Sequence, residues 1–284
     1  IKSALPDPEI ALIEDAAQAM GGIANESFLG TQADVGFFSL GRGKALSTVS
    51  GGVVLTDFNE LAEAMQAAVH KLTAQSIAYQ MQSLAYACTL SALMPPSMFW
   101  LPKAVPGLSL GETIYDPHFP MKRFMPFQAG LARGWPKRLA GLQRVRKENV
   151  RSWLRSLSPF PWLKPVPKVY ALQPTPPLLR LPVLAADASL RDALLAQSER
   201  HGLGIMPIYP DSLDGIAALG LQGSGANSGA KTCASRLLTL PVHTFVTDKD
   251  RQMIIQCLEN IEPPPKGSRP GQIRIPPVCF SSSQ

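Results

Sequence analysis

Three short apolar runs near the start of the chain constrain its fold most strongly. They cover residues 10–13, 35–40 and 53–56, and each is bounded by acidic residues, glycine or proline. Runs of this length with such boundaries are typical of strands buried in a parallel sheet. The first run is followed directly by Glu14 and Asp15, so its carboxyl end carries polar groups.

An amphipathic helix is expected directly after the third run. Asp57 stands in the position of a cap, with Glu60 three residues later. Apolar residues then recur at helical spacing: Leu61, Met65, Ala68, Val69 and Leu72. Short strands that alternate with helices predict an α/β fold with a mainly parallel sheet.

The last third of the chain repeats this alternation. Strands are expected over residues 178–184 and 237–242, and Pro182 favours an edge position for the first of them. A helix is expected over 188–201, ended by Gly202, and a second one begins at a cap formed by residues 247–250 and runs to about residue 260. Small residues over 220–231 predict a loop, and the Pro, Ser and Gly content after residue 262 predicts a disordered tail over 263–284.

Residues 72–102 contain no charged side chain. Their glutamines and serines and the Pro95-Pro96 pair argue against a simple membrane span, which needs about 20 predominantly apolar residues. We expect a helix that is buried or faces another subunit. Contact with a membrane surface or a lipid-linked substrate is the alternative.

A strongly basic stretch covers residues 122–155, with ten Lys or Arg against one acid, Glu148. Its apolar stripe predicts an amphipathic helix that is interrupted near Pro136. The basic face is either simply solvated or contacts a phosphate-bearing ligand or a partner. Nucleic acid is not expected, because the basic residues lack interleaved aromatic ones and the net charge is only +6.

The spacing of the cysteines argues against a disulfide-stabilised protein and against a metal-binding one. Four cysteines and four histidines are scattered without C-x-x-C spacing, so neither a disulfide framework nor a metal site is expected. Reduced cysteines suit a cytoplasmic protein. Because the chain starts at Ile1 with no signal peptide, we expect it to begin inside a longer protein.

Four polar residues are expected to gather at one edge of the sheet. Asp15 and Gln18 follow the first strand, Ser39 ends the second, and Lys44 lies in the glycine-rich loop after it. Ligands of open parallel sheets bind at the carboxyl ends of the strands. A lysine amine, a carboxylate, an amide and a hydroxyl are the groups that pyridoxal phosphate requires. On spacing alone, a lysine in such a loop is usually a surface lysine, and an aspartate after a strand is commonly a turn or cap residue.

Ordered motifs resemble the DegT/DnrJ/StrS family of sugar aminotransferases. They are Ile13-Glu-Asp-Ala-Ala-Gln-Ala19, Phe38-Ser-Leu-x-x-x-Lys44-x-Leu46 and the pair Gly51-Gly52. Further on, Arg123-Phe-Met-Pro-Phe-Gln-Ala129 and Arg236-Leu-Leu-Thr-Leu-Pro-Val-His243 fit later segments of the family pattern. The motifs span about 230 residues in the family's order.

The resemblance implies a role for each matching residue. Lys44 would form the Schiff base with pyridoxal phosphate, and Asp15 would face the pyridine nitrogen. Gln18 would lie against the ring oxygen, and Ser39 would hold the phosphate. Arg123 would help to neutralise phosphate on the cofactor or substrate. Relatives with histidine in place of the lysine are dehydratases, so Lys44 favours amino transfer.

The resemblance also implies an architecture and a reaction. The fold would be aspartate-aminotransferase-like (fold type I), with residues 1–124 as the remaining part of the large domain and 125–262 as a small C-terminal domain. The enzyme would transfer an amino group from an amino acid, glutamate foremost, to a nucleotide-linked keto-sugar in glycan precursor synthesis. A homodimer is implied. The alternative is a catalytically inactive scaffold or regulatory homologue of the same fold.

Overall fold

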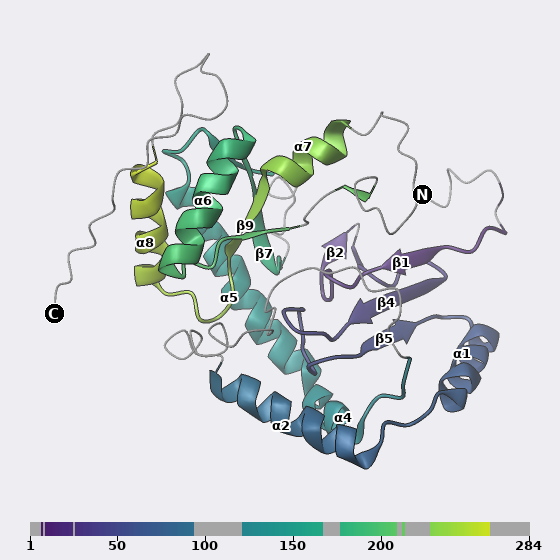
Figure 1. Ribbon diagram of the computed structural model, residues 1–284. Coiled ribbons are helices and arrows are strands. Elements are labelled where there is room, and N and C mark those ends of the chain that lie inside the picture. Colours follow the sequence, from purple (N-terminus) through teal and green to yellow (C-terminus); the bar gives the residue numbers. More distant parts are fainter. Residues whose placement is uncertain are drawn as a thin grey trace. The chain divides into compact units, whose positions relative to one another are not determined.

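The computed structural model describes residue 7 and residues 9–24, 26–93, 121–166, 177–208, 212–213 and 228–261. The chain divides into two compact units, Ile1–Arg144 and Val145–Gln284, which are described separately here (Figure 1). The expected domain boundary between residues 124 and 125 stays a prediction. The predicted tail lies outside the described residues, as do 94–102 of the uncharged run and 220–227 of the predicted loop.

The first unit contains a sheet of three strands. They are β1 (Ile13–Asp15), β4 (Val35–Ser39) and β5 (Gly52–Leu55), in the order β1-β4-β5. A short hairpin of β2 (Ile23–Ala24) and β3 (Ser27–Phe28) lies between β1 and β4 in the sequence. A strand therefore forms at each of the three apolar runs, although β1 overlaps its run only at Ile13. The predicted burial is wrong for Ile13, which is 68% exposed, and for β5, whose four residues are all exposed.

The strand directions differ in part from the expected parallel arrangement. β1 and β4 are parallel, but β5 runs antiparallel to β4. The connection from β4 to β5 consists of turns and bends and contains no helix. Because a parallel partner needs a long crossover, usually through a helix, this connection returns the chain in the opposite direction.

The first unit also holds helices α1 (Asn59–Lys71), α2 (Ile77–Leu93) and α4 (Pro126–Ala132) and the start of α5 (Trp135–Ser156). The predicted Asp57 cap of α1 is wrong: the N-cap is Phe58, without a side-chain hydrogen bond. Thr56 forms the turn instead, because its Oγ1 accepts a hydrogen bond from Phe58 N at 3.2 Å.

The basic stretch is interrupted where the sequence predicted it. α4 ends at Ala132 and α5 begins at Trp135, with Gly134 at φ +68° between them. Pro136 lies in the first turn of α5, where its missing amide hydrogen leaves no helical bond unmade.

The expectation that the uncharged run is buried within the chain is wrong for helix α2. Ala87 is its one buried residue, and Ile77 is 80% exposed. Within the part of the chain that the structure describes, none of the helices has both the length and the apolar character needed to cross a bilayer.

The second unit contains an antiparallel sheet of four strands in the order β6-β7-β9-β8. These are β6 (Leu163–Pro165), β7 (Arg180–Ala185), β8 (Met206–Pro207) and β9 (Leu237–Pro241). Its helices are α6 (Ala188–His201), α7 (Ser228–Arg236) and α8 (Asp248–Glu259). Apolar residues of α6, α8 and the second half of α5 form one core with the sheet, around the fully buried Trp153.

Two predicted helix ends in this unit are confirmed, and two other predictions are wrong. Gly202 ends α6 at φ +64°, and Thr247 caps α8 with a capping box. The predicted loop is wrong over 228–231, which belong to α7. Pro182 lies in a central strand, not at an edge. The carbonyl of Pro182 accepts a hydrogen bond from Val166 N at 3.2 Å, and Val166 is the first residue after β6. The carbonyl and the nitrogen of one residue point to the same side of a strand, so the nitrogen of Pro182, which has no hydrogen to donate, faces the position where β6 has ended.

Candidate functional site

Two of the predicted site residues end neighbouring strands of the first unit (Figure 1). Asp15 is the last residue of β1 and pairs in register with Phe37, and Ser39 is the last residue of β4. Ala16 N donates to Phe37 O at 3.0 Å and fixes this register. Side chains alternate along a strand, so Asp15 and Ser39 share one face of the sheet, opposite the buried Phe38.

A tight turn after β1 presents the polar groups of Asp15 and Gln18. Ala17 N donates to Asp15 Oδ1 at 2.9 Å, which closes an Asx turn. Ala19 N donates to Ala16 O at 2.9 Å, and Gln18 lies between these two residues. Asp15 and Gln18 are both exposed, so neither side chain is committed to the core.

Ser39 and Lys44 are joined by a turn of the glycine-rich loop. Gly41 N donates to Ser39 Oγ at 3.2 Å, and Lys44 N donates to Gly41 O at 3.3 Å. Gly43 has φ +74°, and a Cβ added there would find nothing within 4 Å. The loop therefore borders open space at Gly43, while Lys44 itself is half-buried.

Buried residues on either side of Lys44 anchor this loop in the core. Leu40, Ala45 and Leu46 are at most 3% exposed. Leu40 N donates to Gly51 O at 2.9 Å, at the far end of the loop. Gly51 has φ +103°, and an added Cβ would lie 2.5 Å from the ring of Phe124, so this position requires glycine.

Gln128 holds the same loop from helix α4, a role that the sequence analysis did not assign. The side chain is 2% exposed. Its Nε2 donates to Ser50 O at 3.0 Å and to Ser50 Oγ at 2.9 Å, and its Oε1 accepts from Met125 N at 2.8 Å. Gln128 is the glutamine of the motif that begins at Arg123, and that motif was the signal that could have identified it.

Arg123 lies at the carboxyl end of helix α1. Its Nε donates to Leu72 O at 2.8 Å, and its Nη2 donates to His70 O. These carbonyls have no partner inside the helix, so a cation there is favourable. The contact gives Arg123 a structural part, and its predicted contact with phosphate stays a prediction.

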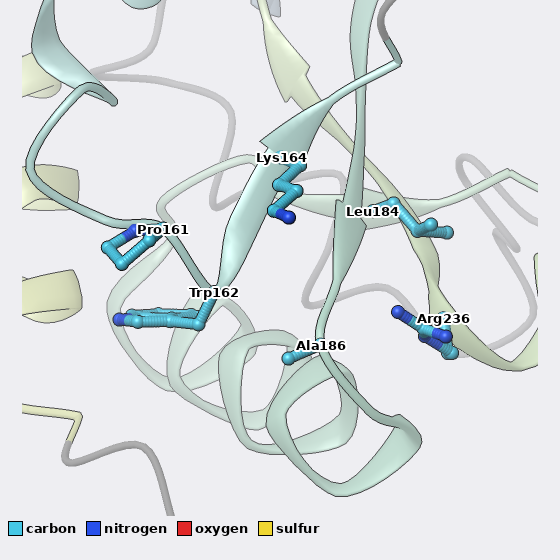
Figure 2. A pocket seen from close by; sticks show the side chains of 6 residues that line it. All are labelled: Pro161, Trp162, Lys164, Leu184, Ala186 and Arg236. Carbon is cyan, nitrogen blue, oxygen red and sulfur yellow. The ribbon is translucent and has the colours of Figure 1, made fainter.

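The second unit contains a cavity that the sequence did not predict. Its volume is about 220 Å³, and its lining includes Trp162, Lys164 and Arg236 (Figure 2). Arg236 Nε donates to Ala185 O at 2.8 Å. None of the predicted site residues lines this cavity.

A half-buried cation, Arg180, lies in the sheet of the second unit. Arg180 Nε donates to Thr239 Oγ1 at 2.7 Å, and its Nη2 donates to the carbonyls of Gly204 and Thr239. Burial lowers the pKa of Arg180 to about 10. Through these bonds Arg180 links β7 to β9 and to the loop before β8.

Comparison with protein families finds one match. Residues 4–94 match the model of the DegT/DnrJ/EryC1/StrS aminotransferase family. This range contains Asp15, Gln18, Ser39 and Lys44. The resemblance that the motifs indicate is therefore confirmed over this range. No curated protein matches the chain.

Several solved structures share the fold. An aminotransferase of this family from Brucella abortus is 21% identical, with a TM-score of 0.61, and the match covers 88% of this chain and 56% of that one. The Helicobacter pylori aminotransferase PseC, involved in pseudoaminic acid biosynthesis, is 17% identical with a TM-score of 0.64 and coverages of 89% and 59%. GDP-4-keto-6-deoxy-D-mannose-3-dehydratase from Escherichia coli, with bound hydrated pyridoxal phosphate, is 16% identical with a TM-score of 0.62 and coverages of 90% and 62%.

These likenesses confirm the predicted fold class. The chain has the fold type I architecture of pyridoxal-phosphate enzymes. It spans 56% to 62% of the length of the three solved proteins. Both aminotransferases and a dehydratase share this architecture, so the choice of reaction depends on the site residues.

Proposed function

We propose that the protein containing this chain is a pyridoxal-phosphate-dependent aminotransferase that acts on a keto-sugar. The observation that carries the proposal is the register of β1 and β4, which sets Asp15 and Ser39 on one face of the sheet, with the Lys44 loop directly after Ser39. The family match over residues 4–94 supports it. Lysine at position 44, and not histidine, favours amino transfer over dehydration.

The residues at this edge fit the cofactor by their chemistry. Pyridoxal phosphate, when bound, supplies an electron sink for the carbon next to the substrate amine. The carboxylate of Asp15 would hold a proton on the pyridine nitrogen, and Gln18 would donate to the ring oxygen. Ser39 Oγ would donate to the phosphate.

Lys44 would perform two tasks. Its amine would condense with the aldehyde of the cofactor with loss of water, and the substrate amine would then take its place and return the free lysine amine. The released amine would then carry a proton between the two carbons that exchange the amino group. The buried Leu40, Ala45 and Leu46 on either side support the loop during this exchange of partners.

The substrate and assembly follow from the resemblance. We propose a nucleotide-linked keto-sugar as acceptor and an amino acid, glutamate foremost, as donor, for glycan precursors. The family builds its active site between two subunits, so we expect a cytoplasmic homodimer.

Reduction with borohydride tests the covalent assignment. The purified full-length protein, incubated with pyridoxal phosphate and reduced, should carry a phosphopyridoxyl group on the peptide that contains Lys44. Lys44→Ala should lose this mass and also the glutamate-dependent formation of 2-oxoglutarate. The matched control Lys249→Ala changes an exposed lysine of α8 and should retain both.

Two outcomes would refute the proposal. If Lys44→Ala retained both the cofactor adduct and amino transfer, the assignment of Lys44 would be wrong. If the wild-type protein bound no cofactor at all, the non-catalytic scaffold would be the better reading.

A further inference from the structure

The cavity of the second unit has two cations and an aromatic ring in its lining. Its volume is about 220 Å³, and it is lined by Pro161, Trp162, Lys164, Leu184, Ala186 and Arg236. None of these six residues is acidic, and all of them belong to the second unit. Figure 2 shows Trp162 and Arg236 on opposite sides, with Lys164 between them. The cavity therefore offers positive charge next to an apolar wall.

The register of β6 and β7 places four of the lining residues on one side of the sheet. Lys164 pairs with Leu184, and Ala186 N donates to Trp162 O at 2.8 Å, which continues the same register. Side chains alternate along a strand, so these four residues lie opposite the buried Leu163. The strand pairing thus holds the lysine and the aromatic ring next to each other.

The ring of Trp162 is held in place by a residue of the core. Its centre lies 6.0 Å from that of Phe160, with 79° between the two ring planes. Phe160 is 8% exposed, whereas Trp162 is half-buried. A ring fixed in this edge-to-face contact offers a flat apolar surface to a second ring at little further cost in side-chain entropy.

Arg236 and Lys164 are both available to an anion. Arg236 Nε donates to Ala185 O at 2.8 Å, which anchors the guanidinium. Among the described residues, the structure records no hydrogen bond of the two Nη groups of Arg236 and none of the exposed Lys164 amine. Each Nη group carries two N–H donors, and such donors pair well with a carboxylate or a phosphate.

One carboxylate, Asp187, acts on Arg236. Partial burial acts to raise the pKa of Asp187, but hydrogen bonds from Ser189 and the Leu190 amide and the charge of Arg236 hold it below its usual range. Its Oδ1 accepts from Ser189 Oγ at 2.6 Å and from Leu190 N at 2.9 Å, and Asp187 does not line the cavity. Asp187 offsets part of the charge of Arg236, and Lys164 adds a second positive charge.

We propose that this cavity binds a small organic anion that carries a planar ring, as a phosphate monoester or a carboxylate. The ring would stack on Trp162, and the anionic group would contact Lys164 and the Nη groups of Arg236. The ligand is small because pockets for drug-sized molecules measure about 300 to 1,000 Å³. Lys44 belongs to the first unit, so the proposal does not rest on the proposed function.

Isothermal titration calorimetry with phenyl phosphate and with benzoate tests the proposal. The full-length protein is first loaded with pyridoxal phosphate and freed of the excess, so that the cofactor site does not take up the probe. At least one probe should bind with a dissociation constant of about 0.1 to 1 mM, and the tighter one identifies the anionic group. Phenol without the charge, and inorganic phosphate or acetate without the ring, should bind at least about tenfold more weakly.

Single variants locate the binding. Lys164→Gln changes an exposed side chain and should weaken binding about three- to fivefold, and Trp162→Leu should weaken it about fivefold or more. Asp187→Asn keeps a good N-cap and removes a negative charge, so it should tighten binding about twofold, an effect that misfolding does not produce. The matched control Lys249→Gln changes an exposed lysine of α8 outside the cavity and should bind as the wild type does. Circular dichroism checks that each variant is folded.

Four results would overturn the proposal. These are the absence of binding by both ring-bearing anions, equal binding of the uncharged or ring-free controls, binding that neither Lys164→Gln nor Trp162→Leu changes, and weaker binding by a folded Asp187→Asn. If the protein retained no cofactor, the proposed function would fail, whereas the effect of Lys164→Gln would still decide whether this cavity binds the probe.

Discussion

Gln128 offers the sharpest test of how the loop after Lys44 is held. Its amide group, 2% exposed, makes two hydrogen bonds to Ser50 and accepts one from Met125 N. Gln128→Leu keeps the size of the side chain but removes these three bonds and a longer one, 3.4 Å, to Thr48 O. Each net bond is worth about 0.5 to 1.5 kcal/mol, and the buried Met125 N–H loses its acceptor. We expect the free energy of unfolding to fall by about 2 to 4 kcal/mol.

Gln197 of α6 provides a matched comparison. It is 3% exposed, but its Oε1 has no hydrogen-bond partner among the described residues. Gln197→Leu makes the same chemical change at a site where a buried polar atom is already unsatisfied. Its removal should cost less than about 1 kcal/mol or even stabilise the protein.

Urea denaturation followed by circular dichroism measures both variants, and hydrogen exchange locates the effect. In Gln128→Leu, the peptide covering residues 40–52 should exchange at least about tenfold faster, because the loop amides open more often. In Gln197→Leu this peptide should exchange as in the wild type. Equal losses of stability in the two variants, or an unchanged loop in Gln128→Leu, would refute the reasoning.

Three further predictions concern single groups. Burial raises the pKa of the Cys257 thiol to about 11, so maleimide at neutral pH should label exposed Cys88 in the folded protein and Cys257 only after unfolding, as peptide mass spectrometry would show. Partial burial acts to raise the pKa of Asp187, but hydrogen bonds from Ser189 and the Leu190 amide hold it below its usual range. Asp187→Ala should therefore cost about 1 kcal/mol in urea denaturation at pH 7. The cost should fall as the pH drops below about 4, because the unfolded chain then takes up a proton before the folded carboxylate does, and the contribution of Asp187 is lost once both are protonated. Lys44→Ala should change the free energy of unfolding by less than about 1 kcal/mol, measured in the same way.

The predictions that succeeded rest on local physics. Gly202 ends α6 because glycine accepts a positive φ, and Thr247 caps α8 with its own hydroxyl. Both effects act within a few residues, so the sequence contains all the information. The strands at the short apolar runs were predictable for the same reason.

The predictions that failed depend on neighbours distant in the sequence. Pro182 fits a central strand because β6 stops pairing beside it, which the sequence around Pro182 cannot reveal. The direction of β5 depends on the course of the whole 40–51 connection. Of the readings offered for the uncharged run, burial within the chain is wrong for α2, whose half-buried side includes the polar Gln80 and Ser83.

For the candidate site too, local motifs allowed some residues to be predicted, and contacts between distant residues did not. Motifs placed Asp15, Ser39 and Lys44 near one sheet edge, and the register of β1 and β4 brings the first two to one face. The part played by Gln128 required tertiary contacts, since 78 residues separate it from Ser50.

In the loop around Lys44, the residues that hold the loop in place are different from the one proposed to react. This makes the variant Lys44→Ala informative. Leu40, Ala45 and Leu46 supply the apolar contacts, and the turn at Lys44 is closed by its backbone amide, which alanine keeps. Lys44→Ala therefore removes the amine while leaving the main supports of the loop. A loss of amino transfer in a variant of unchanged stability would then be attributable to the missing amine. The variant Gln128→Leu would serve as the comparison, because it keeps the amine of Lys44 and loosens the loop that positions it.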